Sequence, residues 1–123
     1  MLEYTLDEAR ARVQRSLLYM KAHLEEPFDL GKASQAAALS PSYFIRVFKR
    51  LEGETPGKRF RRLRFAAMDQ LIAEDPERSL TELAMRFGFS SPGALTREFR
   101  AFVGSSPSTC KTFFASLRRA AGF

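Results

Sequence analysis

The chain repeats itself with a spacing of 51 residues. The dipeptides Ser40-Pro41 and Thr55-Pro56 recur as Ser91-Pro92 and Ser106-Pro107. The residues around them correspond as well: Phe44 with Leu95, Arg46 with Arg97, Phe48 with Phe99, Lys49 with Arg100 and Gly53 with Gly104. A repeat of this kind indicates that one small structural unit occurs twice, so we expect a fold built from two copies of a single module.

The repeated dipeptides have the composition of helix starts. A Ser or Thr hydroxyl caps the unpaired N–H groups of a first helical turn, and proline in the next position loses no backbone hydrogen bond. Gly53 and Gly104 are typical of helix ends, since glycine adopts the left-handed conformation there. Together with helical spacing of apolar residues, these signals predict seven helices: Leu6–Glu25, Leu30–Ala38, Pro41–Glu52, Pro56–Glu74, Leu80–Phe87, Pro92–Val103 and Pro107–Ala120.

The predicted fold is all-α, because no segment alternates polar and apolar residues as a strand does. We expect one domain over residues 1–123, with helix-turn-helix subdomains at 5–53 and 79–120 joined by a linker helix, 56–74. A helix of that length spans roughly 28 Å, close to the ~34 Å between successive major grooves on one face of DNA. The first helix should bury Leu6, Val13, Leu17, Met20 and Leu24.

Positive charge is concentrated in one segment. The chain carries a net charge of +6, and residues 46–64 hold eight basic side chains against only Glu52 and Glu54. The basic residues are Arg46, Lys49, Arg50, Lys58, Arg59, Arg61, Arg62 and Arg64. Such a cluster favours a polyanionic partner, most often nucleic acid, although a solvated helix face has the same composition.

Few side chains are suited to catalysis or metal binding. His23 and Cys110 are the only histidine and cysteine, and they are far apart in the sequence. The motifs typical of metal, nucleotide and nucleophile sites do not occur. We therefore expect no enzyme, metal or cofactor, with His23 on a helix surface and Cys110 as a small buried apolar residue. A single cysteine, no apolar run of membrane-spanning length and no secretory signal fit a cytoplasmic protein.

The second helix of each predicted pair has one apolar and one basic face. Both helices place an arginine, Arg46 or Arg97, one turn before a second basic residue, Lys49 or Arg100. Arginine can donate to O6 and N7 of guanine in the major groove, and the later basic residue can reach a phosphate. Ile45 has two open interpretations, contact with a thymine methyl group or an ordinary surface aliphatic residue.

Two stretches resemble a known family. They are LSPSYFIRVFKRLEGETPGKRFRRLR over Leu39–Arg64 and LTELAMRFGFSSPGALTREFRAFVGSSP over Leu80–Pro107. The second contains L-x-x-L-A-x-x-x-G-F, then R-x-F-R, then G-x-S-P, in register. The sequence resembles the AraC/XylS family of bacterial transcription regulators over about residues 8–115. The resemblance implies two helix-turn-helix subdomains whose second helices enter adjacent major grooves of double-stranded DNA.

The resemblance also suggests functional residues and partners. We expect base contacts from Ser42, Tyr43, Ile45, Arg46, Gly93, Thr96 and Arg97, and phosphate contacts from Ser40, Lys49, Arg50, Ser91 and Arg100. Family members mostly activate transcription and contact RNA polymerase, and they need no cofactor in this domain. Most carry a separate effector-binding domain, usually N-terminal, which also makes the dimer contacts. A chain of this length is either a stand-alone regulator or an excised DNA-binding domain, and we expect a monomer.

Several positions depart from the family pattern. Ala38 stands where glycine is usual, and Arg59 where an aromatic residue is usual. The helix beginning at Pro92 continues with Gly93 and Ala94, where polar side chains are common. We therefore expect the first subdomain to carry more of the sequence selectivity than the second.

Two other functions remain open. The chain could be a protein-interaction module, an adaptor or anti-regulator that keeps the fold. A basic, apolar C-terminal segment, Thr112–Phe123, could instead lie on a membrane surface, although a terminal helix docked on the second subdomain explains it as well.

Overall fold

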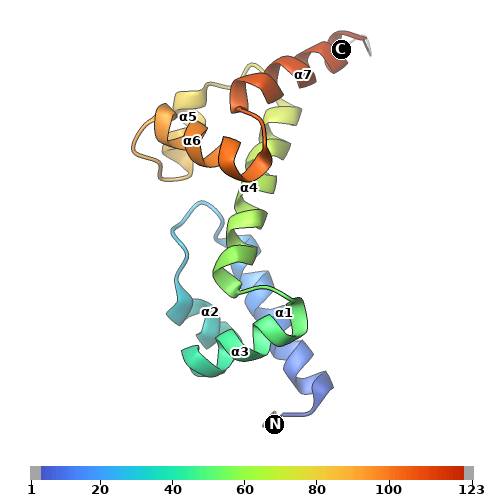
Figure 1. The fold of residues 1–123 in the computed structure, drawn as a ribbon, viewed down its shortest axis with the longest axis vertical. Helices are drawn as coiled ribbons and strands as arrows, with labels where there is room; N and C mark the ends of the chain where they lie inside the picture. The colour runs from blue at the N-terminus through green and yellow to red at the C-terminus, as the bar shows by residue number, and fades with distance from the viewer. Residues whose placement is uncertain (1–3, 121–123) are drawn as a thin grey trace. The chain divides into compact units, whose positions relative to one another are not determined.

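The computed structural model describes residues 4–120, except for the side chain of residue 118. Within this range the chain is all-α and contains no strand (Figure 1). The helices are α1 (Leu6–Ala22), α2 (Leu30–Ala36), α3 (Pro41–Glu52), α4 (Pro56–Glu74), α5 (Leu80–Arg86), α6 (Pro92–Val103) and α7 (Pro107–Ala120). The all-α prediction is confirmed. Of the C-terminal segment 112–123, residues 121–123 lie outside the described range.

The bounds of α3 and α6 are those predicted, because both helices have strong start and stop signals. Ser40 is the N-cap of α3 and Ser91 the N-cap of α6, each followed by proline. Gly53 and Gly104 end the two helices with φ values of 79° and 94°, a conformation that a side chain disfavours. The repeat in the sequence is thus a repeat of this capped helix.

The end of α1 was predicted three residues too late. The helix ends at Ala22 rather than Glu25, and the N–H of His23 donates to the carbonyl of Met20, 3.0 Å away, in a tightened last turn. Negative side chains at a helix C-terminus oppose the helix dipole, and residues 25 and 26 are both glutamate. Pro27 also disfavours a helical conformation at the residue before it.

The ends of α2 and α5 were also predicted too late, because both helices finish in a Schellman turn. After α2, the N–H of Leu39 donates to Ser34 O at 3.0 Å and the N–H of Ala38 donates to Gln35 O at 2.9 Å. Ala38 consequently has φ 56°, and Gly88, which follows α5, has φ 76°. The departure at Ala38 therefore places an alanine in a backbone conformation that favours glycine.

The two helix-turn-helix pairs differ by one residue in the turn. The first helices, α2 and α5, both have 7 residues and start 50 positions apart. The second helices, α3 and α6, both have 12 residues and start 51 positions apart. The turn before α6 is therefore one residue longer than the turn before α3.

The chain divides into two compact units, one ending at Leu63 and the other beginning at Arg64. In the first unit, α1, α2 and α3 pack on one another around a core that also includes Phe60 of α4. Its largest buried side chains are Val13, Met20, Phe44, Val47 and Phe48. Leu6 was predicted to be buried but is 49% exposed, because the stripe of α1 instead continues through Ala9.

The second unit has its own aromatic core. Phe65 stacks on Phe102 with ring centroids 5.3 Å apart and meets Phe99 edge-on at 6.0 Å. Met68, Ile72, Leu83, Phe87 and Leu95 are also buried there. Because the aromatic side chains of α6 point into this core, the basic side chains of α6 lie on the opposite face of the helix.

No helix among the described residues is long and apolar enough to cross a membrane. Phe113 and Leu117 of α7 are 58% and 49% exposed, so this helix is not completely covered by its own unit.

Candidate nucleic-acid interface

Helix α3 separates its apolar and basic residues cleanly. Phe44, Val47 and Phe48 are buried in the first unit. Among the predicted contacts on the other side, Ser42, Arg46, Lys49 and Arg50 are exposed, and Ile45 and Tyr43 are half-buried. Because the buried face of α3 is held by the packed core, the basic side chains on the other face project from a helix whose position in the unit is defined.

Tyr43 belongs partly to the core, which refines its predicted role. Its ring lies 6.2 Å from that of Tyr4 and packs against the cluster of the first unit. The guanidinium carbon of Arg46 lies 5.5 Å from the centre of the Tyr43 ring, within the range of a cation–π contact. Tyr43 therefore supports Arg46, the residue predicted to bind guanine.

Helix α6 presents fewer side-chain donors. Leu95 and Phe99 are buried, whereas Arg97 and Arg100 are exposed. Gly93 is exposed and offers no side chain. The hydroxyl of Thr96 donates to the carbonyl of Pro92 at 2.9 Å. In this arrangement the Thr96 hydroxyl can accept a hydrogen bond from another molecule but has no proton left to donate.

The predicted phosphate ligands Ser40 and Ser91 are both N-caps. The hydroxyl of Ser40 accepts from the N–H of Tyr43 at 3.4 Å, and that of Ser91 accepts from the N–H of Ala94 at 3.1 Å. Both residues are exposed. Because each oxygen accepts within the cap, its proton can be donated to an anion at the start of the helix.

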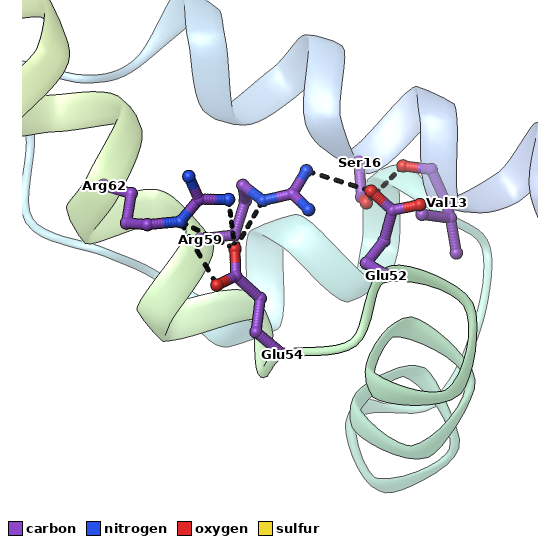
Figure 2. A network of polar contacts seen from close by, with 6 residues as sticks. All are labelled: Val13, Ser16, Glu52, Glu54, Arg59 and Arg62. Atoms are coloured by element: carbon purple, nitrogen blue, oxygen red, sulfur yellow. Dashed lines mark hydrogen bonds and ion pairs between the residues drawn. The ribbon is translucent and has the colours of Figure 1, made fainter.

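An ion-pair cluster connects the end of α3 to the start of α4 (Figure 2). The guanidinium of Arg59 donates through Nε to Glu54 at 2.6 Å and through Nη1 to Glu52 at 2.9 Å. Arg62 donates through Nη2 to the same Glu54 carboxylate at 2.7 Å. These donors lower the pKa of Glu54 to about 2, since two hydrogen-bonded guanidinium groups favour its charged form.

This cluster was missed from the sequence, and it changes the interpretation of the basic segment. Two of the eight basic residues, Arg59 and Arg62, face the only two acidic residues of that segment. Arg59 also lies over the buried Phe48 ring, at 5.8 Å, so its departure from the family pattern is accommodated by packing and by charge. The unusual residue at position 59 was the one sequence signal that could have indicated this ion-pair cluster.

Arg64 is a third basic residue of this segment whose side chain is not simply exposed to solvent. Its guanidinium lies 5.1 Å from the Phe89 ring centre and 5.9 Å from that of Phe87, within the second unit. Its Nε is buried with no hydrogen-bond partner, and burial lowers the pKa of the group. Arg46, Lys49 and Arg50, which are exposed on α3, are therefore better candidates for DNA than Arg59 and Arg64.

The titratable residues that could support other chemistry are in ordinary settings. His23 lies at the end of α1, where its Nδ1 is 2.7 Å from the Tyr19 carbonyl and its ring stacks on that of Tyr19. Cys110 is half-buried rather than fully buried, and desolvation raises its pKa. Within residues 4–120, no three His, Cys, Asp or Glu side chains gather as metal ligands do.

Comparison with known proteins places this fold among helix-turn-helix proteins. The model of a family described as "Helix-turn-helix domain" matches residues 33–112. "Probable transcriptional regulator LumQ" of Photobacterium leiognathi is 34% identical over 95 residues, covering 77% of this chain and 38% of LumQ. The "Multiple antibiotic resistance protein MarA" of Escherichia coli is 32% identical over 89 residues, covering 72% of this chain and 69% of MarA.

A solved structure extends the similarity to a DNA complex. The DNA-binding domain of the global transcriptional factor AdpA, solved with a target DNA, is 30% identical and superimposes with a TM-score of 0.71. The match covers 87% of this chain and 96% of that structure. Against longer relatives the coverage is smaller, since the chain spans about a third of LumQ and of a Mycobacterium tuberculosis regulator, 38% and 33%.

Proposed function

The chain belongs to the AraC/XylS family of helix-turn-helix proteins, and we propose that it is a sequence-specific DNA-binding transcription regulator. The similarity to the AdpA DNA-binding domain, whose structure contains a target DNA, supports DNA as the partner. The relatives with assigned names are transcriptional regulators rather than enzymes.

The proposed mechanism uses α3 and α6 as reading helices in adjacent major grooves. Arg46 and Arg97 donate to O6 and N7 of guanine, the most common specific contact of arginine with DNA. Lys49 and Arg100, one turn later, bind phosphates and fix the register. Ser42, Tyr43, Ile45, Gly93 and Thr96 complete the base-facing surfaces, and Ser40, Arg50 and Ser91 the phosphate contacts.

One observation carries this proposal. Arg46 and Arg97 occupy corresponding positions in two helices of equal length, and each is exposed opposite a buried phenylalanine, Phe48 or Phe99. A solvated helix face explains exposure of the two arginines. It does not explain why both follow a Ser-Pro start and precede a second basic residue by one turn. Two matched reading helices explain both features.

The remaining assignments are part of the same proposal. We propose residues 1–123 as one DNA-binding domain, with subdomains 5–53 and 79–120 and the linker helix 56–74. The regulator acts in the cytoplasm at the nucleoid, as a monomer at this length, and contacts RNA polymerase as an activator. The chain is either a stand-alone regulator or the DNA-binding part of a longer protein that also has an effector-binding domain, and it spans 38% of LumQ and 33% of the Mycobacterium tuberculosis relative.

Selection of bound duplexes from a random DNA library tests the function. We expect enrichment of one sequence motif and an affinity that falls steeply with salt, with a slope near −0.9 per phosphate neutralised. The double variant Arg46→Ala/Arg97→Ala should lose the enrichment while keeping the helical content of the parent. Absence of any motif together with affinity indifferent to salt would favour a protein-interaction module instead.

A further inference from the structure

We propose that Glu54 holds Arg62 away from DNA phosphate and so lowers the part of the DNA affinity that does not depend on sequence. The inference rests on the proposed DNA-binding function. Glu54 lies in the turn between α3 and α4, where its carboxylate accepts from Arg62 and from Arg59 at once. Its side chain is 13% exposed, so the carboxylate is largely covered by the groups it binds.

The geometry of the pair with Arg62 is that of a strong ion pair. Nε of Arg62 lies 3.0 Å and 3.2 Å from the two carboxylate oxygens, and Nη2 lies 2.7 Å from Oε1. A guanidinium with this forked contact has its donors aimed at the carboxylate. The Arg62 side chain is nevertheless 49% exposed, so it could reach solvent and a phosphate if Glu54 no longer held it.

The cluster is close to the part of α3 that we expect to bind phosphate. Glu52 lies three residues after Lys49, which puts the two side chains on the same face of the helix, one turn apart. Arg59 contacts Glu52 at 2.9 Å, so the cluster reaches that face directly. Positive charge released here would therefore add to the field that attracts DNA of any sequence.

Removing the carboxylate charge should release Arg62 but not Arg59. Arg59 retains Glu52 and its place over Phe48, at 5.8 Å. Releasing one guanidinium to one phosphate makes the slope of log K against log salt steeper by about 0.9. Over a fourfold rise in salt this is an extra three- to fourfold loss of affinity, by roughly the same relation.

The test measures binding of the full chain to a duplex of scrambled sequence over about 50–200 mM salt. Glu54→Gln keeps the shape of the side chain and should bind more tightly at low salt with the steeper slope. Glu77→Gln removes the same formal charge from an exposed residue and should leave the slope unchanged. If Glu54→Gln and Glu77→Gln have equal slopes, the inference is wrong.

A double-mutant cycle separates release of Arg62 from a general change in local charge. Arg62→Gln alone should leave the slope unchanged, since the paired arginine makes no phosphate contact. In the Glu54→Gln background the same substitution should remove the gain. An equal effect of Arg62→Gln in both backgrounds would overturn the inference. A merely structural role for Glu54 would lower stability without raising affinity for scrambled DNA.

The outcomes also distinguish this inference from the proposed function. If the parent chain shows no salt-dependent affinity for DNA, the proposed function itself fails. If the parent binds a selected sequence and Glu54→Gln leaves the salt slope on scrambled DNA unchanged, only the role of Glu54 fails. We expect Glu54→Gln to raise the affinity for selected and scrambled duplexes alike, because a contact with phosphate does not depend on the base sequence.

Discussion

The hydroxyl of Thr96 donates a hydrogen bond to the carbonyl of Pro92, 2.9 Å away within the first turn of α6. This bond occupies the donor that Thr96 could offer to a base, and the neighbouring Gly93 and Ala94 have no side-chain donor. In α3 the corresponding turn carries Ser42 and Tyr43. The structure thus strengthens the physical basis for an unequal division of base reading between the two helices.

The first prediction concerns this asymmetry. Arg46→Ala should cost more discrimination between single-base variants of the selected site than Arg97→Ala, because neighbouring side chains of α3 add to the contact. Each arginine contributes about 1–3 kcal/mol against the wrong base if it binds guanine through two hydrogen bonds. Titration of both variants against all single-base variants measures the difference. An equal or larger loss for Arg97→Ala would refute the asymmetry.

A second prediction distinguishes phosphate contacts from base contacts. Lys49→Ala and Arg100→Ala should weaken binding to all sequences alike, and each should make the salt slope shallower by about 0.9. Binding to the selected site and to scrambled DNA over a salt series measures both effects. Lys21→Ala, in the last turn of α1 rather than in α3 or α6, removes the same charge and is the control. A change in base preference on loss of Lys49 would show that it reads sequence instead.

The third prediction is a gain in stability at Ala38. Its φ of 56° is costly for alanine and easy for glycine, so Ala38→Gly should raise the free energy of unfolding by about 1 kcal/mol. The reverse change, Gly88→Ala, should lower it by about the same amount, since a β-carbon there meets nothing closer than 3.9 Å and only the backbone opposes it. Urea unfolding measures both. Destabilisation by Ala38→Gly would mean that this turn does not constrain φ.

A fourth prediction follows from the lowered pKa of Glu54. Because its pKa falls from 4.5 to about 2 on folding, the carboxylate stabilises the fold fully above pH 4.5, and this contribution is lost as the pH falls toward 2. The difference in unfolding free energy between the parent and Glu54→Gln should therefore shrink over that interval. Urea unfolding at several pH values tests this, with Glu77→Gln as the charge-matched control. A difference that is constant with pH would contradict the ion pairs.

The fold was predictable wherever local chemistry sets a helix end. Ser40 with Pro41 and Gly53 gave the correct bounds of α3, because cap and stop residues act on their immediate neighbours. The end of α1 was wrong because apolar spacing continued through Leu24, while the tightened turn at His23 depends on the balance of several weak effects. The predicted burial of Leu6 was wrong because helical spacing alone does not show how far along α1 the neighbouring helices cover it.

The sequence predicted which face of α3 and of α6 is exposed, but it did not predict which charged side chains pair with one another near the site. Exposure of Arg46 and Arg97 followed from the periodicity of the buried phenylalanines. The pairing of Arg59 and Arg62 with Glu54 did not, because the sequence separations of five and eight residues cross a helix start. Contacts of this kind depend on the angle between two helices, which the local sequence does not define.

Guanine methylation interference on the selected DNA site tests the central claim most directly. Methylation at N7 blocks the acceptor that arginine uses, so we predict two clusters of interfering guanines about one helical turn, roughly 10 base pairs, apart. Arg46→Ala should abolish interference in one cluster and Arg97→Ala in the other. A single cluster, or a pattern that neither substitution changes, would contradict reading of DNA by both helices.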